Sequence, residues 1–191
     1  YEVMNPAVSF RLHETGSIIG QAQVASGAAH IAVSDLPIVQ DYKTYPLLQI
    51  NFIRLPVLFI ANQVTISDLT AQQVKGIYNG QYQNWKEIGG HDLPITVVLR
   101  SDFSGITWVL RDWLQAPVTP FTSIRVPSNL RALEQVVAIP GAISAVGGMP
   151  FGYDVRIMSI DGCLPEQSTT QDCDYPLLYN GSIVINKQPS I

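Results

Sequence analysis

Short apolar runs alternate along the chain with stretches that have the hydrophobic spacing of helices. The run at 95–99, Ile-Thr-Val-Val-Leu, is typical of a buried strand, and residues 104–114 follow it without a linker. Their apolar residues recur at the i, i+3, i+4 and i+7 spacing of a helix that packs on a core. Further strands are predicted at 31–33, 55–61, 143–146, 155–159, 176–179 and 183–185. This alternation indicates the α/β class.

Capping residues predict where the helices begin and end. We expect Ser17 to cap a helix over 18–26 that stops at Gly27. The sequence Thr70-Ala71-Gln72-Gln73 has the form of a capping box and predicts a helix that ends at Asn79-Gly80. A further helix is predicted over 130–137, with its core face formed by Leu130, Leu133, Val136 and Val137.

Composition and charge exclude several classes of protein. Of the 191 residues, 47% are hydrophobic and 14% are charged, against about 25% charged in an ordinary soluble domain, so disorder is excluded. Eleven basic and fifteen acidic residues give a formal charge of −4, and the basic ones are scattered. We therefore expect no nucleic-acid partner. The uncharged stretch 135–153 contains two prolines and four glycines, which favours turns over a membrane helix.

The two cysteines give an indication of the cellular compartment in which the protein works. Cys163 and Cys173 lie in a polar segment that is typical of an exposed loop. We prefer a disulfide between them, which implies an oxidising compartment, and two free thiols are the alternative. A zinc site would need further Cys or His ligands at short spacing, and none lies nearby. The chain starts at Tyr1 with no signal-peptide pattern, so we expect that any signal peptide has been removed or the sequence trimmed.

Two predicted junctions between a strand and a helix place Gly and Ser side by side. They are Gly16-Ser17 and Ser104-Gly105. The N-terminus of a helix exposes unpaired N–H groups and a partial positive charge, so each junction can hold an oxyanion. An ordinary helix cap is the alternative at each place.

Charged residues beside these junctions favour the anion site. Arg100 ends the predicted strand, and Asp102 is placed to orient the guanidinium, although a surface ion pair would have the same pattern. Asp35 follows the strand at 31–33. Its carboxylate can accept the proton of hydrogen phosphate and repel fully ionised sulfate. The alternative for Asp35 is a turn or cap residue before Pro37.

Catalysis has less support. The sequence contains no Gly-x-Ser-x-Gly elbow, no His-Glu-x-x-His pattern and no phosphate loop. Ser104 next to Arg100 keeps a hydrolase as a third hypothesis, but no base is evident for it. We therefore expect a protein that is not an enzyme and that needs neither a cofactor nor a metal.

A series of motifs adds a family resemblance. In chain order they are Gly16-Ser17-x-x-Gly20, the segment 23–35, the segment 69–90, Arg100-x-Asp102-x-Ser104-Gly105 and Tyr175-Pro176-Leu177. Together they resemble the PstS-like phosphate-binding proteins of bacterial phosphate ABC transporters, over about residues 1–179. The resemblance implies a type II periplasmic-binding-protein fold, in which two lobes with mixed sheets enclose phosphate in a cleft.

The resemblance also implies a set of site residues. The implied phosphate ligands are Gly16, Ser17, Asp35, Arg100, Ser104 and Gly105. In this reading the serine hydroxyls and the Gly105 N–H donate to phosphate, Asp35 accepts its proton, Arg100 pairs with it and Asp102 holds Arg100. Two positions depart from the family pattern, Phe103 in place of Gly and Ile106 in place of Thr, and both are expected to make the lip of the cleft more apolar.

The leading hypothesis is an extracytoplasmic solute-binding domain, periplasmic or attached to the cell surface. It would bind a small oxyanion, with phosphate as the preferred candidate, by lobe closure and deliver it to an ABC transporter permease. We expect lobe I at 1–56 plus 159–191 and lobe II at 57–158. The alternative is a ligand-sensing or protein-interaction domain of the same fold that has lost high-affinity phosphate binding.

The ends of the chain raise one more expectation. Members of the family begin with a strand and a Gly/Ser/Thr loop and end with a helix, and neither is evident here. We therefore expect a trimmed chain or a shortened relative. In a shortened relative, phosphate binding would be weak and the uncovered sheet edge would promote self-association.

Overall fold

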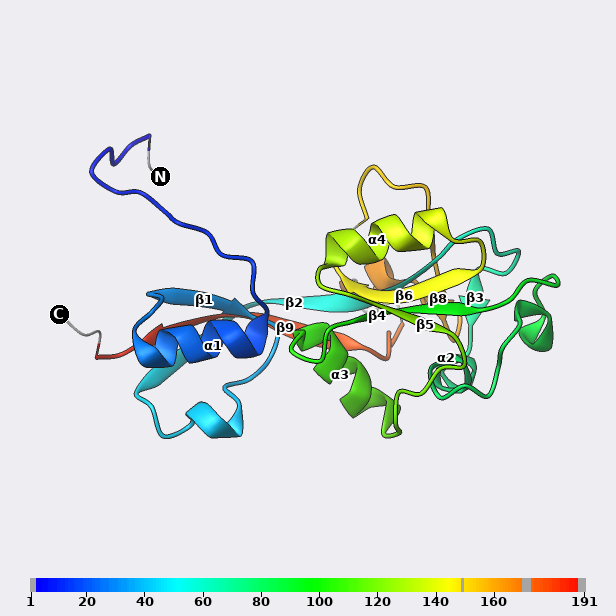
Figure 1. Cartoon of the computed structure of the whole chain (residues 1–191), viewed down its shortest axis with the longest axis horizontal. Coiled ribbons are helices and arrows are strands. Elements are labelled where there is room, and N and C mark those ends of the chain that lie inside the picture. Colours follow the sequence, from blue (N-terminus) through cyan, green and yellow to red (C-terminus); the bar gives the residue numbers. More distant parts are fainter. Residues whose placement is uncertain (1–2, 149, 170–172, 189–191) are drawn as a thin grey trace.

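Two antiparallel strands run through both halves of the molecule and join them (Figure 1). The structure is a computed structural model that describes residues 3–148, 150–169 and 173–188. Strand β2, Leu47–Ala61, pairs with β9, Leu178–Asn186, along its first part and with β6, Ala142–Gly147, along its last part. The strand order β1-β9-β2-β6-β4-β5 is therefore one continuous sheet, with β7 also paired to β2.

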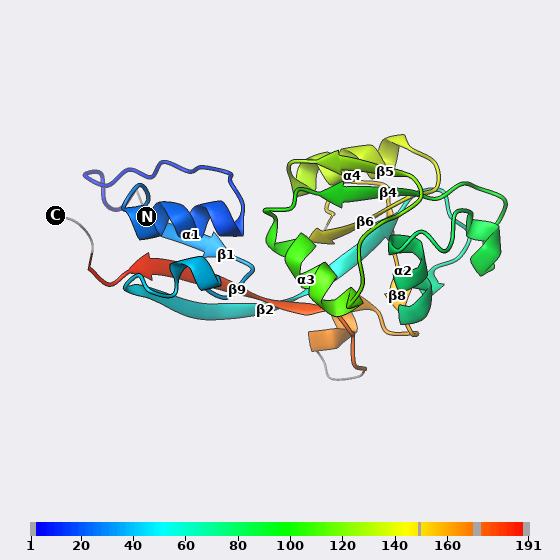
Figure 2. The same ribbon diagram turned by 60° about the horizontal axis from the view of Figure 1, so that its bottom comes forward.

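The small lobe is a three-stranded sheet covered on one face by a helix. Strand β1, Ile31–Ser34, lies at the edge of the sheet and pairs with β9. Helix α1, Ser17–Ser26, and the short 3₁₀ helix η1, Gln40–Tyr42, lie beside it (Figure 2). Because side chains alternate along a strand, the core takes every second residue. The buried core residues of this lobe are Val24, Ala32, Leu47 and Val184.

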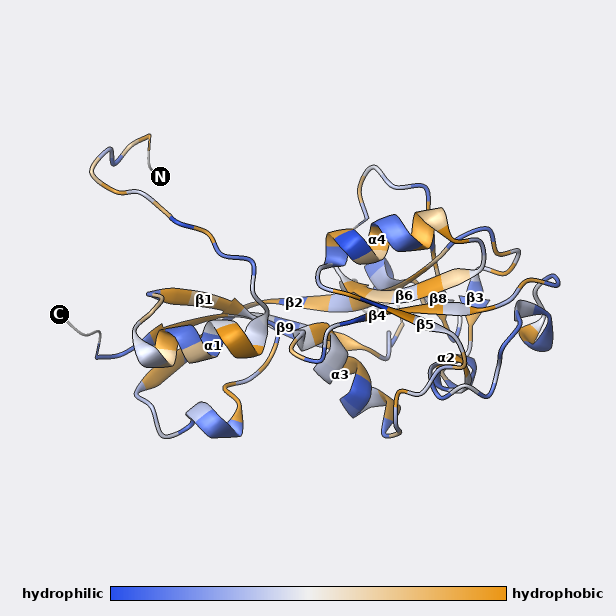
Figure 3. Ribbon diagram, viewed as in Figure 1, coloured by the Kyte–Doolittle hydropathy of each residue, from blue (hydrophilic) through white to orange (hydrophobic). Residues whose placement is uncertain are grey.

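The opposite face of the small-lobe sheet is apolar and exposed. Ile31, Val33 and Ile50 are 55%, 67% and 48% exposed. Figure 3 shows β1 coloured as hydrophobic along its length. An exposed row of this kind on an edge strand is a surface that can pair or pack with another chain.

The large lobe places its part of the sheet between helices. Its elements are β3 Asp68–Leu69, α2 Ala71–Tyr78, η2 Trp85–Ile88, β4 Thr96–Arg100, α3 Gly105–Leu114, β5 Ser123–Val126, α4 Asn129–Ala138, β6, β7 Arg156–Ile157, β8 Ser159–Ile160 and η3 Pro165–Thr169. Phe59 and Leu99 pack in the core that includes α3, whereas Leu58 and Val98 pack in the core that includes α4. Both faces of β4 and of the last part of β2, residues 57–61, are therefore buried, which explains their continuous apolar runs.

The segment that follows β8 also packs on the large lobe. Cys163, Tyr175 and Leu177 belong to the core that includes α3, and the Tyr175 hydroxyl donates to the Val57 carbonyl at 2.8 Å. The predicted disulfide between Cys163 and Cys173 is present. These contacts favour placing residues 160–169 and 173–177 in the large lobe, whereas the sequence analysis expected them in lobe I. The lobe boundaries stay a prediction, and residues 1–2, 149, 170–172 and 189–191 within them lie outside the described part of the chain.

Several predicted helix boundaries are confirmed. Helix α1 ends at Gly27, which is in the left-handed conformation (φ 78°). The capping box at Thr70 is present with both of its hydrogen bonds. Ser17, however, is the first residue of α1 and not its cap, because the preceding glycine, Gly16, takes the N-cap position at φ 124°. The Ser17 side chain is therefore available for another partner.

Other predictions about elements were wrong in part. The helix predicted over 130–137 is α4, and Leu133 and Val136 pack on the sheet as expected, together with Ala132. Leu130 and Val137, which were expected on the same face, are 52% and 40% exposed. Leu130 and Val137 are seven residues apart, two helical turns, so they share one side of the helix, and this side turns away from the sheet. Strand β5 was not predicted, and the two strands expected at 176–179 and 183–185 are one strand, β9.

The uncharged stretch 135–153 holds the end of α4 and strand β6. Within the described ranges, no helix combines the length and the apolar character that a membrane span requires.

Candidate functional site

The two predicted Gly-Ser junctions face each other across the lobes. Gly16 and Ser17 begin α1, and Gly105 begins α3. A Cβ atom placed on Gly105 would lie 2.6 Å from the Asp35 Cβ and 2.7 Å from the Ser17 Oγ. A Cβ on Gly16 would lie 3.1 Å from the carbonyl oxygen of Phe103. The two helix N-termini therefore meet at a point where only glycine fits, and their partial positive charges favour an anion there.

The hydroxyl groups at this point are not used to cap the helices. Ser17 is buried, and its Oγ accepts a hydrogen bond from the backbone N–H of Asp35 at 3.0 Å. That bond leaves the hydroxyl proton of Ser17 to be donated. Ser104 is also buried and occupies the N-cap of α3, yet its side chain makes no capping hydrogen bond. Both hydroxyl groups can therefore serve a ligand.

Asp35 and Arg100 supply opposite charges near the junctions. Burial raises the pKa of the Asp35 carboxyl, and the nearby Arg100 opposes this by favouring the ionised form. Burial also lowers the pKa of Arg100, while the carboxylates of Glu14 and Asp35 oppose that shift. An arginine remains cationic under these conditions. The site thus contains a fixed positive charge and a carboxyl group that takes up a proton more readily than usual.

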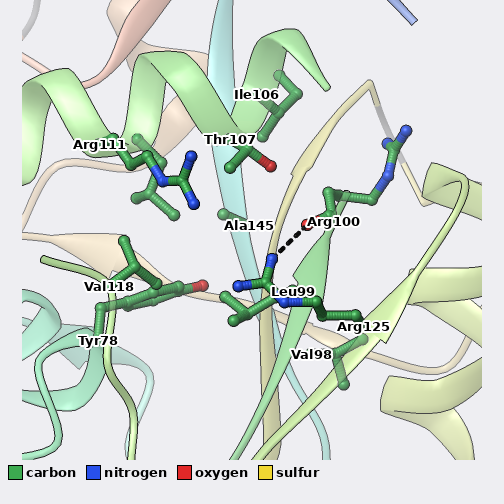
Figure 4. A pocket seen from close by; sticks show the side chains of 11 residues that line it. Tyr78, Val98, Leu99, Arg100, Ile106, Thr107, Arg111, Val118, Arg125 and Ala145 are labelled. Atoms are coloured by element: carbon green, nitrogen blue, oxygen red, sulfur yellow. Dashed lines mark hydrogen bonds between the residues drawn. The ribbon is translucent and has the colours of Figure 1, made fainter. Parts of the chain in front are cut away.

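The predicted pairing of Asp102 with Arg100 is corrected by the structure. Asp102 pairs with Arg111 at 2.5 Å and with Arg125 at 3.1 Å. Arg125 lies on β5, directly beside β4 in the parallel register, and Arg111 lies on α3. Both guanidinium groups are therefore within reach of the Asp102 carboxylate. Figure 4 shows the guanidinium of Arg100 pointing away from those of Arg111 and Arg125. Asp102 therefore anchors α3 and β5 and does not orient Arg100.

The two departures from the family motif have different outcomes. Phe103 is 56% exposed beside Gly16, as expected for an apolar lip. Ile106 is 2% exposed and packs in the core of the large lobe. Its Cδ1 lies 3.0 Å from the position that a Cβ on Gly147 would occupy. The expectation that Ile106 lines the lip was therefore wrong.

Other polar residues near the site were missed by sequence reasoning. Glu14 interacts electrostatically with Arg100, and its place two residues before Gly16 was the signal available. Burial and the Asp35 charge raise the pKa of Tyr179 to about 12, so its hydroxyl stays a donor. Tyr179 and Asp35 also line a cavity of about 510 Å³ between the lobes, together with Gln49 and Trp108.

Comparison with known proteins gives the family. A model for the PBP superfamily domain matches residues 1–189. The phosphate-binding protein PstS of Bacillus subtilis (strain 168) is 29% identical over 181 residues, which are 91% of this chain and 59% of that protein. The PstS of Borreliella burgdorferi is 24% identical in an alignment of 204 positions, which covers 98% of this chain and 72% of that protein. The chain thus spans 59% and 72% of the lengths of these two curated relatives.

Solved structures show the same fold. A substrate-binding protein with bound phosphate from Clostridium perfringens superposes with a TM-score of 0.91 at 22% identity, over all of this chain and 79% of that one. An ABC-type phosphate transport receptor from Vibrio cholerae gives a TM-score of 0.73 at 21% identity, over all of this chain and 80% of that one. The predicted two-lobed, type II binding-protein fold is confirmed. The chain belongs to the PBP superfamily domain family, in which it is similar to phosphate-binding proteins named PstS.

Proposed function

We propose that this domain binds inorganic phosphate between its two lobes and carries out no reaction on it. The observation that carries the proposal is the meeting of Gly105, Ser17 and Asp35, which brings both helix N-termini to one point. Two curated relatives of this chain are named phosphate-binding proteins, which supports the choice of anion. Binding by lobe closure needs no nucleophile or base, so we propose a binding protein and not an enzyme.

The geometry gives each residue a distinct part in this proposal. The hydroxyl groups of Ser17 and Ser104 and the backbone N–H of Gly105 donate to phosphate oxygens. Arg100 supplies the positive charge from a partly buried position, where charge-assisted hydrogen bonds are strong. Asp35 accepts the proton of hydrogen phosphate, which fully ionised sulfate lacks, and this distinguishes the two anions.

Calorimetric titration of the purified domain with phosphate, sulfate and acetate tests the proposal. Phosphate should bind and sulfate should not. Substituting Arg100→Ala should weaken phosphate binding by about 2–4 kcal/mol, because the buried anion loses a charged partner. The matched control is Arg131→Ala, an exposed arginine that pairs with Glu134 on α4 and should leave the affinity unchanged. Equal affinity for phosphate in Arg100→Ala would contradict the assignment.

We also propose that the domain works outside the cytoplasm and passes its ligand to an ABC transporter permease. The disulfide between Cys163 and Cys173 supports an oxidising compartment. The name of the Vibrio cholerae structure, a phosphate transport receptor, supports the transport role. A pull-down of a membrane permease by the phosphate-loaded domain, and not by the phosphate-free one, would test this partner.

The small-lobe sheet favours a second candidate, a protein-interaction domain. Strand β1 pairs with β9 on one side and with no other strand in the described part of the chain, and Ile31 and Val33 on it are mostly exposed. Self-association through this edge was predicted from the sequence and remains a proposal. Sedimentation at increasing concentration would test it, with Val33→Lys as the variant that should abolish association. A monomer at every concentration would remove this candidate.

A further inference from the structure

The guanidinium of Arg100 is held by the start of helix α4. Its Nη1 donates to the Oδ1 of Asn129, and its Nη2 donates to the carbonyl oxygen of Pro127 at 3.1 Å. Asn129 is the first residue of α4. One end of the guanidinium is therefore attached to the loop before this helix, on the large lobe.

Asn129 is itself fixed at both ends of its amide. Its Nδ2 donates to the carbonyl oxygen of Gly147 at 3.0 Å, at the end of β6. Because a guanidinium has only donors, the Oδ1 must face Arg100 and the Nδ2 must face Gly147. One neutral side chain thus ties the end of β4, which carries Arg100, to the end of β6.

The remaining edge of the guanidinium has no protein partner. The Nε of Arg100 is buried and makes no hydrogen bond to any residue that the structure describes. A buried N–H of a charged group that stays unpaired is costly, so this edge is suited to an acceptor supplied by a ligand. The carboxylates of Asp35 and Glu14, both on the small-lobe side, attract Arg100 electrostatically.

The neutrality of Asn129 has a consequence for an anion. A carboxylate at this place, such as the one expected from Asp102, would offset the positive charge of Arg100. Asp102 is instead paired with Arg111 and Arg125. An amide holds the guanidinium by hydrogen bonds while leaving its charge for the ligand.

We propose that Asn129 is a positioning residue of the anion site, which fixes Arg100 so that its Nε edge meets the bound anion. The nature of that anion rests on the proposed function, whereas the positioning of Arg100 does not. The proposal adds a residue that touches Arg100 and not the anion. It predicts that a change at Asn129 acts through the order and the charge of the guanidinium.

Three variants test this inference. Asn129→Ala removes both hydrogen bonds of the amide. Asn129→Asp keeps an acceptor for Arg100 but adds a negative charge beside it. The matched control is Asn62→Ala, because the Asn62 amide donates to the Val137 carbonyl near the other end of α4 at 2.8 Å and does not contact Arg100.

Each variant is tested by two measurements. Calorimetry gives the affinity for inorganic phosphate, and NMR follows the Nε–H resonance of Arg100, identified as the signal lost in Arg100→Lys. In the unaltered domain, phosphate should shift this resonance. Asn129→Ala should weaken phosphate binding by about tenfold or more, since a charged hydrogen-bonding group is no longer held in place. Its Nε–H should also exchange faster with water before any phosphate is added.

Asn129→Asp should keep the slow exchange of the Nε–H and still bind phosphate more weakly, most clearly at low salt. Asn62→Ala should change neither measurement. The inference is overturned if Asn129→Ala retains the slow exchange and the affinity, or if Asn62→Ala alters them equally. If the unaltered domain does not bind phosphate at all, the proposed function fails, and the exchange rates of the phosphate-free variants still decide whether Asn129 positions Arg100.

Discussion

At the scale of single residues, the site depends on Gly105, because this residue has no side chain. Gly105 begins α3 with ordinary helical geometry, so its backbone does not require glycine. The space beside it does, because a Cβ there would lie under 3 Å from atoms of both Asp35 and Ser17. The glycine is needed for the contact between the lobes and not for the helix.

Substituting Gly105→Ala should therefore separate closure from folding. Alanine favours a helix over glycine by roughly 0.5–1 kcal/mol, so the large lobe should be no less stable. The clash should hold the lobes apart and weaken phosphate binding by about tenfold or more, since overpacking costs about 1–3 kcal/mol. Calorimetry together with small-angle scattering in phosphate would check this. Unchanged affinity and compactness would show that the lobes do not close at Gly105.

The pH dependence of stability should report on Asp35. Burial raises the pKa of its carboxyl above the ordinary 3.8, so the ionised form opposes folding at neutral pH and the protonated form does not. In phosphate-free buffer, Asp35→Asn should raise the free energy of unfolding at neutral pH. This gain should shrink as the pH falls through the raised pKa toward 3.8. Denaturant titrations at several pH values would measure it.

The control for that series is Asp41→Asn, an exposed aspartate in η1. Its effect on the free energy of unfolding gives the baseline for exchanging a carboxylate for an amide at an exposed position. A gain from Asp35→Asn that is the same at every pH would indicate that the amide stabilises the protein by a route other than charge.

The sequence points to the candidate site residues more readily than to the residues that hydrogen-bond to them. Gly16, Ser17, Asp35 and Gly105, which the structure brings together, each have a local signal in the sequence: glycine or serine at a helix start, or a carboxylate at the end of a strand. The partner of Arg100 could not be found, because Asn129 comes beside it only through the pairing of β4 with β6 and the packing of α4. A hydrogen bond between residues distant in the chain leaves no periodic pattern in the sequence.

At the scale of elements, local sequence patterns predicted whether a segment is a helix or a strand better than they predicted which face of it is buried. The capping box at Thr70 and the strand at 95–99 were predicted because each has a local signature. The sequence Asn180-Gly181-Ser182 resembles a turn, and this split β9 into two predicted strands. In the sheet, β2 has an irregularity between Asn51 and Ile53 opposite this place, so the pairing continues past Gly181.

The disulfide of the loop after β8 should contribute modestly to stability. It joins cysteines ten positions apart, for which the loop-entropy relation gives roughly 3 kcal/mol or less. The double substitution Cys163→Ala with Cys173→Ala should lower the free energy of unfolding by that amount at most, and the protein should still fold. Chemical denaturation with and without a reductant would check this. A protein without the disulfide that fails to fold would show that the loop supports the large-lobe core more than expected.

At the scale of the whole molecule, the chain passes from the small lobe to the large one in β2 and returns in β9. The irregularity in β2 and Gly181 in β9 lie side by side at this passage. A Cβ on Gly181 would lie 2.6 Å from the Cγ2 of Ile53. A side chain at position 181 would therefore collide with Ile53 at the point where the chain passes between the lobes.

Substituting Gly181→Ala should restrict movement of the lobes relative to each other. Ile53 would have to shift, at a cost of about 1–3 kcal/mol if the strands cannot relax. We expect lower stability and a slower approach to binding equilibrium with phosphate, measured by stopped-flow fluorescence. Loss of stability with unchanged binding rates would place the hinge elsewhere in the two strands.

The position of β9 also determines the order in which the protein is completed during synthesis. In the small lobe, β9 lies between β1 and β2, where Ile183 faces Val33 on one side and Ile50 on the other. The ribosome makes β1 and β2 long before β9. Until β9 is made, these two strands lack the strand that lies between them, while the large lobe is synthesised. The large lobe can therefore fold first, and the half of the proposed anion site on α1 is assembled only when the returning strand arrives.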